Sequence, residues 1–170
     1  GPVTALTAGQ ASATVFPIGT TTVTYEVTDA SSNTNTCSFD VTVNDTQNPA
    51  ITCPADITQN NDAGVCGATI TYATPVGTDN CPGQVTALTA GQASATVFPI
   101  GTTTVTYQVT DASANTSTCS FTVTVNDTQN PAITCPSNIT QSNDLNVCGA
   151  TITYATPVGT DNCPGPVTAL

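Results

Sequence analysis

Cysteine and aspartate are the residues of this chain whose chemistry and spacing recur. The eight cysteines form two series of four, and the residue numbers of the second series exceed those of the first by 82 (119 − 37 = 82). They are Cys37, Cys53, Cys66 and Cys81, then Cys119, Cys135, Cys148 and Cys163. Thiols can bind soft metals, act as nucleophiles or pair as disulfides. Because the chain has no histidine and no Cys-x-x-Cys pair, the series favours structural disulfides formed in an oxidising compartment.

The other reactive residue types argue against catalysis. The chain contains no His, Lys or Arg, so triads, Schiff bases, arginine clamps and His-ligated metals are unavailable. A carboxylate pair of the glycosidase kind remains, but an active site repeated almost verbatim in each copy would be unusual. We therefore expect no enzyme, no catalytic residue and no residue that binds an organic cofactor.

Four aspartates recur in both copies, and all of them fall in turn-like sequence. The recurring pairs are Asp29/Asp111, Asp45/Asp127, Asp62/Asp144 and Asp79/Asp161. One interpretation is that each carboxylate accepts nearby backbone N–H groups in its turn. The other is a calcium ion at the junction between copies, because calcium takes six to eight oxygen ligands. The candidate ligands are then Asp45, Asp127, Asp79 and Asp111, although their spacing matches no EF-hand or RTX motif.

The stretch VNDTQNPAITCP occurs twice, beginning at Val43 and at Val125. Residues 1–88 align with residues 83–170 without a gap and differ at eleven positions. We interpret the chain as about two periods of a longer tandem array. The expected division is the C-terminal half of one repeat at 1–44, a complete repeat at 45–126, and the N-terminal half of the next at 127–170. Residues 44–49 are then a short, semi-rigid seam that ends in proline, and the array is expected to form an elongated rod.

Apolar residues alternate with a period of two, and no segment shows a helical period. In the complete repeat this pattern predicts short strands at residues 50–58, 66–73, 84–90, 93–99, 103–111 and 119–125. Six or seven short strands separated by frequent turn residues predict an all-β fold. The expected architecture is a tandem array of antiparallel β-sandwich domains of the immunoglobulin or fibronectin type, which recur with the same offset of 82 as the cysteines.

Strand geometry bears on the disulfide pairing. The first and last strands of such a sandwich run parallel and begin at the same end, which favours a bond between Cys53 and Cys119. Within the repeat, this leaves Cys66 and Cys81 to pair with each other, although the loop that carries Cys81 must then fold back along the sheet. The predicted disulfides are Cys53–Cys119, Cys66–Cys81 and, by the repeat offset, Cys148–Cys163. Cys37 and Cys135 have no partner in this frame.

The net charge of −11 bears on partners. A chain without cations cannot displace counterions from nucleic acid, and it is repelled by anionic membrane surfaces. No apolar run reaches membrane-spanning length, and no signal peptide is present in the segment. The expected partners are neighbouring repeats of the same chain and other copies in a filament.

Three stretches resemble a known family: DTQNPAITCPADIT, CGATITYATPVGTDNCPG and FPIGTTTVTYQVTDASANTSTCSFTVTV. They are similar to the hyalin repeat, or HYR, domain, and the similarity covers the whole chain. The resemblance implies an immunoglobulin-like sandwich, an extracellular location and a role in adhesion. The additional pair Cys66 and Cys81 resembles the bacterial form, which occurs in tandem arrays on large surface adhesins, including filaments of gliding bacteria. We therefore expect a structural stalk, with a module that binds a glycan or protein as the alternative.

Overall fold

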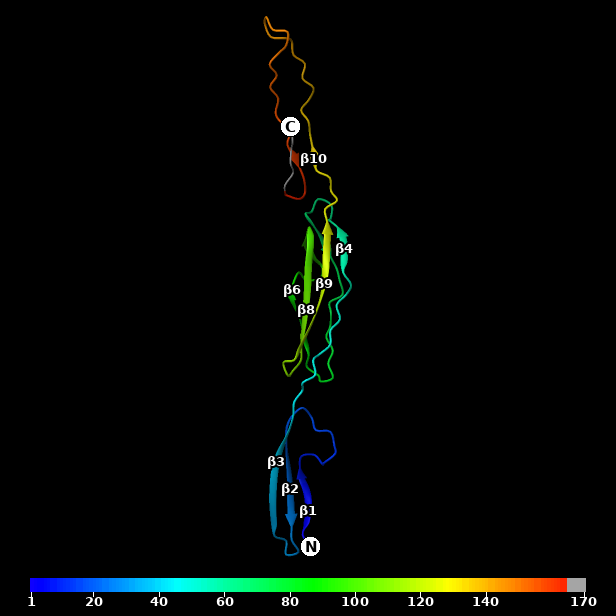
Figure 1. The fold of residues 1–170 in the computed structure, drawn as a ribbon, viewed down its shortest axis with the longest axis vertical. Coiled ribbons are helices and arrows are strands. Elements are labelled where there is room, and N and C mark those ends of the chain that lie inside the picture. The colour runs from blue at the N-terminus through cyan, green and yellow to red at the C-terminus, as the bar shows by residue number, and fades with distance from the viewer. Residues whose placement is uncertain (165–170) are drawn as a thin grey trace. The chain divides into compact units, whose positions relative to one another are not determined.

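The computed structural model describes residues 1–164, and its regular structure is entirely β-strand (Figure 1). Internal contacts divide the chain into two compact units. The first comprises residues 1–50, 77–85 and 109–117, and the second holds the remaining described residues. No helix in the described part of the chain is long and apolar enough to cross a membrane. The all-β fold class is therefore confirmed.

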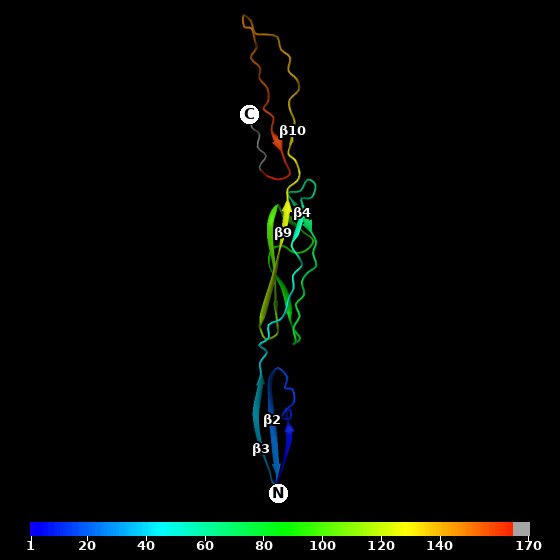
Figure 2. The ribbon, with the colours of Figure 1, turned by 45° about the vertical axis from the view of Figure 1, so that its right-hand side comes forward.

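The complete repeat is a sandwich of two sheets (Figures 1 and 2). Its strands are β4 (Ile57–Asn60), β5 (Gly67–Ile70), β6 (Val85–Ala90), β7 (Thr96–Pro99), β8 (Gly101–Thr110) and β9 (Thr116–Asn126). One sheet has the strand order β4-β9-β8-β6, and the other pairs β5 with β7 antiparallel. The first strand, β4, runs parallel to the last, β9, as the sandwich model predicts.

The first strand is shorter than the sequence suggests. Ala50 makes only an isolated antiparallel bridge with Thr78, and regular pairing begins at Ile57. Pro54 lies between these two points, and proline has no N–H group to donate to a neighbouring strand. The ladder is therefore interrupted where the proline falls.

The alternating residues of β8 and β9 supply the core, as the period of two predicts. Val105 is fully buried, and Tyr107 and Phe121 are 5% and 3% exposed. The β5 side contributes Tyr72, whose ring packs edge-on against Phe121 at a centroid distance of 5.0 Å. The remaining buried members of this cluster are Ala68, Ile70, Phe98, Val123 and Val125.

Tyr72 also satisfies its hydroxyl group inside this core. The hydroxyl donates to the carbonyl oxygen of Gln92 at 2.6 Å and lies 3.1 Å from the hydroxyl of Tyr107. Burial, together with the Tyr107 hydroxyl, raises the pKa of Tyr72, so the phenol stays protonated. The Tyr72 side chain therefore has an apolar partner for its ring, Phe121, and polar partners for its hydroxyl group.

One glycine is required by close packing. Gly91 follows β6 with φ +81°, and a Cβ built on it would lie 2.6 Å from the carbonyl oxygen of Thr104 on β8. A side chain at this position would meet both a left-handed backbone and an occupied space. The same arrangement recurs one period earlier, where Gly9 lies against Thr22.

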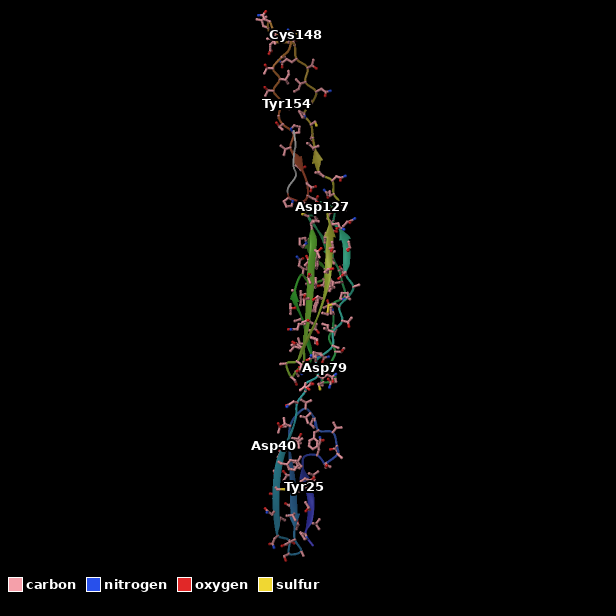
Figure 3. All side chains as sticks on the ribbon, in the orientation of Figure 1. Tyr25, Asp40, Asp79, Asp127, Cys148 and Tyr154 are labelled. Atoms are coloured by element: carbon pink, nitrogen blue, oxygen red, sulfur yellow. A yellow bond between two sulfur atoms is a disulfide. The ribbon has the colours of Figure 1, made fainter. Side chains whose placement is uncertain are left out.

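Residues 1–43 form a three-stranded sheet that is the counterpart of β6, β8 and β9. Its strands are β1 (Val3–Ala8), β2 (Gly19–Thr28) and β3 (Thr34–Val43), in the order β1-β2-β3. The β2–β3 register runs unbroken from Gly19↔Val43 to Thr28↔Thr34. Tyr25, labelled in Figure 3, lies on β2. The sequence repeat is thus matched by a repeat of local structure.

Residues 132–160 contain only β10 (Ala132–Ile133) and β11 (Gly159–Thr160), which pair antiparallel. This pair reproduces the Ala50–Thr78 bridge one period later, since 50 + 82 = 132 and 78 + 82 = 160. The pairing of the two loops therefore recurs at both places where the repeated stretch occurs.

The structure contains the predicted disulfide between Cys53 and Cys119, with a Cα–Cα distance of 5.6 Å. The second disulfide joins Cys66 to Cys163, with a Cα–Cα distance of 4.7 Å, and leaves Cys81 and Cys148 free. The predicted bonds Cys66–Cys81 and Cys148–Cys163 are therefore wrong. Cys37 and Cys135 are also free.

The reason is that Cys66 and Cys81 belong to opposite ends of β9. The turn containing Cys66 follows Asn61, whose N–H donates to the carbonyl oxygen of Asn126, the last residue of β9. Cys81 is hydrogen-bonded to Asp45, whose carbonyl oxygen accepts from Asn115, the residue before β9 begins. The loop that carries Cys81 does not fold back along the sheet.

Candidate functional site at the seams between repeats

The first seam, residues 44–49, lies against a loop and a turn of the first unit. The loop is residues 77–81, and its Thr78 exchanges two backbone hydrogen bonds of 2.8 Å with Ala50, the residue that follows the seam. The turn is residues 111–115, and its Asn115 side chain donates to the carbonyl oxygen of Asp45 at 3.2 Å. The repeated stretch therefore makes specific polar contacts on two sides.

Two carboxylates and a thiol converge at this seam. Ligand atoms of Asp45, Asp79 and Cys81 all lie within 4.8 Å of one another. A hydrogen bond to the Asp45 carboxylate, burial, and the charges of Asp79 and Asp111 raise the pKa of the Cys81 thiol. The thiol therefore stays protonated at neutral pH, which makes it a weak nucleophile and a poor metal ligand in this state.

Asp111, the fourth predicted ligand, is engaged by its own turn. Its Oδ1 accepts the backbone N–H groups of Ser113 and Asn115 at 2.9 and 2.8 Å, and its Oδ2 accepts from the Asn115 side chain at 2.8 Å. Only 6% of the residue is exposed. Burial raises the pKa of Asp111, but the hydrogen bonds outweigh it and the net pKa is lowered. The carboxylate is therefore charged and serves to close the turn.

The second seam, residues 126–131, repeats the cluster within the second unit. Ligand atoms of Asp127, Asp161 and Cys163 again lie within 4.8 Å of one another. Asp79 and Asp127 both lie outside the strands (Figure 3). Here the sulfur is bonded to Cys66, so no thiolate is available to a metal. Asp161 was missing from the predicted ligand set, although it is the period counterpart of Asp79.

The turn-capping interpretation of the recurring aspartates is confirmed. All eight carboxylates accept a backbone N–H group, and the pattern is the same in both copies. The acceptor and donor pairs are Asp29–Ser31, Asp111–Ser113, Asp45–Gln47, Asp127–Gln129, Asp79–Cys81, Asp161–Cys163, Asp62–Thr69 and Asp144–Thr151. Each of these aspartates therefore has a structural role that requires no ion.

The donor set fits calcium only in part. The Oδ1 atoms of Asp79 and Asp161 are buried and have no hydrogen-bond partner, so each cluster contains a buried carboxylate oxygen that is free to bind a ligand. Calcium takes six to eight oxygens, and the described residues bring together two carboxylates per seam. The proximity of Asp45 to Asp79, and of Asp127 to Asp161, is the structural basis for any calcium site.

Sequence reasoning missed one group of seam residues. Asn61, Gln129 and Asn162 each make a hydrogen bond across residues that are far apart in sequence. All three are identical in the two copies, at Asn143, Gln47 and Asn80. That identity was visible in the sequence, but amides are so common in turns that it did not single them out.

The comparisons with known proteins agree with this repeat architecture. The chain consists of immunoglobulin-like β-sandwich repeats in tandem, and the model of the HYR domain family matches residues 2–43 and 44–125. The chain therefore belongs to the HYR domain family. This domain is an extracellular module associated with cell adhesion.

The curated relatives are much longer than this chain. Hyalin of Strongylocentrotus purpuratus is 42% identical over 153 residues, covering 86% of this chain and 13% of hyalin. Hyalin of Lytechinus variegatus is 38% identical over 157 residues, covering 87% and 29%. A solved structure, the protocadherin GammaB4 extracellular domain, has a TM-score of 0.32 with this chain and is 14% identical to it. The alignment covers 80% of this chain and 29% of the protocadherin chain, and the likeness is too low to support an argument. These hyalins are sea urchin proteins, so they do not show the bacterial adhesin type that the extra cysteines suggested.

Proposed function

We propose that this chain is a structural spacer: a stalk or filament segment of a repetitive extracellular adhesion protein. The observation that carries the proposal is that one period builds its own core, and that the sequence of this period recurs almost verbatim along the chain. The cluster around Tyr72 and Phe121 draws all its members from residues 68–125, which lie within one period. Such units can be added in series without changing one another's interior.

The distribution of differences between copies supports a spacer over a specific binding surface. The eleven differences include Glu26/Gln108, Ser32/Ala114 and Ala63/Leu145, and they are scattered along the period. A binding face that must distinguish ligands is usually confined to one domain with its own loops. We propose a non-catalytic role on the same grounds, since the chain offers no His, Lys or Arg.

Scattering and imaging of a chain of several repeats test the spacer. The maximum dimension should grow linearly with the number of repeats, because each seam repeats the same contacts. Small-angle X-ray scattering of chains with two, four and six repeats measures this directly. A compact particle whose size grows as the cube root of its mass would overturn the proposal.

The alternative is that each repeat presents a loop to a glycan or a protein. The sea urchin relatives carry the domain in extracellular proteins, which is compatible with either role. A glycan array probed with residues 45–126 distinguishes the two. Specific binding by that single repeat, lost when its loops are exchanged, would favour the binding module.

The finer assignment is to a cell-surface adhesin of the bacterial type, in which neighbouring repeats and other copies in a filament are the partners. Its support is the second pair of cysteines in each period and the near-identity of the copies. Imaging the intact parent protein on its cell would test this assignment. A chain found only in a secreted matrix, detached from cells, would contradict it.

We also propose that calcium binds weakly at the seams through Asp45 with Asp79 and through Asp127 with Asp161. The support is the recurring pair of carboxylates, with a buried oxygen in each pair that is free to bind a ligand. Calcium titration of the wild type and of Asp161→Asn, followed by calorimetry, tests it. Heat that is unchanged in Asp161→Asn would leave only the turn-capping role.

A further inference from the structure

The disulfide between Cys66 and Cys163 crosses from one repeat to the next. Its sequence separation of 97 is the repeat offset of 82 plus the separation of Cys66 from Cys81 (81 − 66 = 15). In the repeat frame that begins at residue 45, the bond therefore joins the second cysteine of one repeat to the third cysteine of the following repeat. In the frame of the family match, Cys66 lies within the copy at 44–125 and Cys163 lies beyond it.

We propose that successive repeats of this chain are joined by a covalent clamp of this kind at each seam. Cys81 and Cys148 are the corresponding halves of the neighbouring clamps. Cys81 bonds the second cysteine of the preceding repeat, and Cys148 bonds the third cysteine of the following repeat. The clamp deepens the proposed spacer function. The mechanical consequence of the clamp rests on that function, but the pairing of its cysteines does not.

Hydrogen bonds hold the two sides of the clamp together in addition to the disulfide. We call residues 61–66 the clamp turn. The Thr128 backbone N–H donates to the side-chain oxygen of Asn61 in this turn at 3.0 Å. Its Gly64 N–H donates to the Gln129 side chain at 2.8 Å, and its Val65 carbonyl accepts from the Asn162 side chain at 2.9 Å. The second seam and the loop before Cys163 thus contact the same turn.

The two loops that the clamp joins each have a counterpart one period away, in which the cysteine is free and the local hydrogen bonds are the same. One period later than the clamp turn, the Asp144 N–H donates to the Gly149 carbonyl at 2.7 Å, as the Asp62 N–H does to Gly67 at 2.8 Å. Cys148 in this turn is exposed and free (Figure 3). One period before Cys163, the Cys81 N–H donates to Asp79 at 3.0 Å, and the Cys81 thiol is free. Both halves therefore take their shape without a partner.

Closure of the clamp is a two-electron oxidation. The thiols of Cys66 and Cys163 lose two protons and two electrons as the S–S bond forms. A small disulfide such as oxidised glutathione takes up both by thiol–disulfide exchange and becomes two thiols. An oxidising extracellular compartment supplies this class of oxidant.

The consequence is a second covalent connection across the seam, in parallel with the peptide chain. Cutting the backbone anywhere between residues 120 and 162 leaves only this disulfide to join the two pieces, because the Cys53–Cys119 bond lies wholly on the N-terminal side. Rotation and separation of adjacent repeats are restricted even where the seam peptide is extended. The seam is therefore a fixed joint instead of a proline hinge.

The absence of Lys and Arg allows a direct test. Ser137→Lys introduces a single trypsin site at an exposed position between the second seam and Cys148. The full chain is refolded in reduced and oxidised glutathione, free thiols are alkylated, and the protein is unfolded in urea and digested with trypsin. Unfolding before digestion makes the cut independent of the fold.

The clamp predicts that residues 1–137 and 138–170 stay together on a non-reducing gel and separate after reduction. With Cys163→Ser added, the pieces should separate without reductant, whereas Cys148→Ser should leave them joined. Separation of the unreduced parent would overturn the proposal, because local Cys66–Cys81 and Cys148–Cys163 bonds give that result. Joined pieces that resist Cys163→Ser would overturn it as well, since another pair would then hold them. Neither outcome depends on whether the array is a spacer, which scattering tests separately.

Discussion

Two copies of one sequence behave differently in this molecule. Residues 1–43 and 83–125 form the same three strands, yet Phe39 is 53% exposed in the first copy and Phe121 is 3% exposed in the second. The same contrast holds between Tyr25, half-buried on β2, and Tyr107 on β8. Since the local sequence is nearly constant, the difference must come from what lies over the strands.

The covering layer is the preceding part of the period. Residues 51–76 supply Ile70, which is 1% exposed, and Tyr72, which is 8% exposed, to the core cluster beneath β8 and β9. Their counterparts Ile152 and Tyr154 are 42% and 56% exposed. A strand-forming sequence therefore specifies local pairing, but the stable interior requires both halves of the same repeat.

The largest expected effect comes from the two phenylalanines. Phe121→Ala should destabilise the complete repeat by about 3–5 kcal/mol, because it removes a ring buried against Tyr72. Phe39→Ala, the matched change on the exposed copy, should change stability by less than about 0.5 kcal/mol. Urea unfolding monitored by tyrosine fluorescence measures both. Equal losses would mean that the covering half does not decide burial.

The next largest effect is expected from the Cys53–Cys119 disulfide, compared with the free thiol of Cys37. Cys119→Ser removes a disulfide with a sequence separation of 66, which the chain-entropy model values at about 4 kcal/mol. Cys37→Ser changes a free, exposed thiol and should leave the midpoint of unfolding unchanged. Both variants are compared in thermal melts without reductant. A large loss in Cys37→Ser would show that this cysteine is bonded in solution.

A smaller effect is expected at the tyrosine pair. Tyr72→Phe removes the donor to the Gln92 carbonyl and the contact with the Tyr107 hydroxyl, at a cost of about 1–2 kcal/mol. Tyr154→Phe alters an exposed ring and should stay within about 0.5 kcal/mol of the parent. Chemical unfolding measures the loss of stability in both variants. An unchanged stability in Tyr72→Phe would show that the buried hydroxyl makes no net contribution.

The smallest effect concerns acid. The pKa of Asp111 is lowered from 3.8, so its turn contributes stability above that pH and loses it as the pH falls through the lowered value. Asp111→Asn should therefore flatten the acid limb of the stability profile of the complete repeat. Asp29→Asn should not, because its turn belongs to the exposed copy, although hydrogen bonds from the Asn33 side chain lower its pKa too. A parallel shift of both variants would contradict this assignment.

The sequence predicted local features better than connections between repeats. The period of two predicted which residues of β8 and β9 face inward, and the parallel first and last strands predicted the Cys53–Cys119 bond. The pairing of Cys66 failed because four cysteines in one period were assumed to pair within that period. The repeat offset alone cannot distinguish a bond from Cys66 to Cys81 from a bond to Cys163, since either pairing recurs once in every period.

The same limit applied to the acids. Their positions in turns predicted capping, and their hydrogen bonds confirm it. That Asp45 approaches Asp79 follows from the bridge between Ala50 and Thr78, a long-range pairing with no local sequence signal. Features that depend on which loops meet at a seam therefore needed the structure.

Hydrogen exchange of the intact chain tests most directly whether a covering half decides the stability of a strand pair. Residues 19–28 of β2 and 101–110 of β8 differ only at Glu26/Gln108, so their intrinsic exchange rates are nearly equal. In dilute solution the amides of β8 should exchange at least about 100-fold more slowly than those of β2, which corresponds to about 2.8 kcal/mol of additional opening free energy. Equal protection of the two strands would contradict the account.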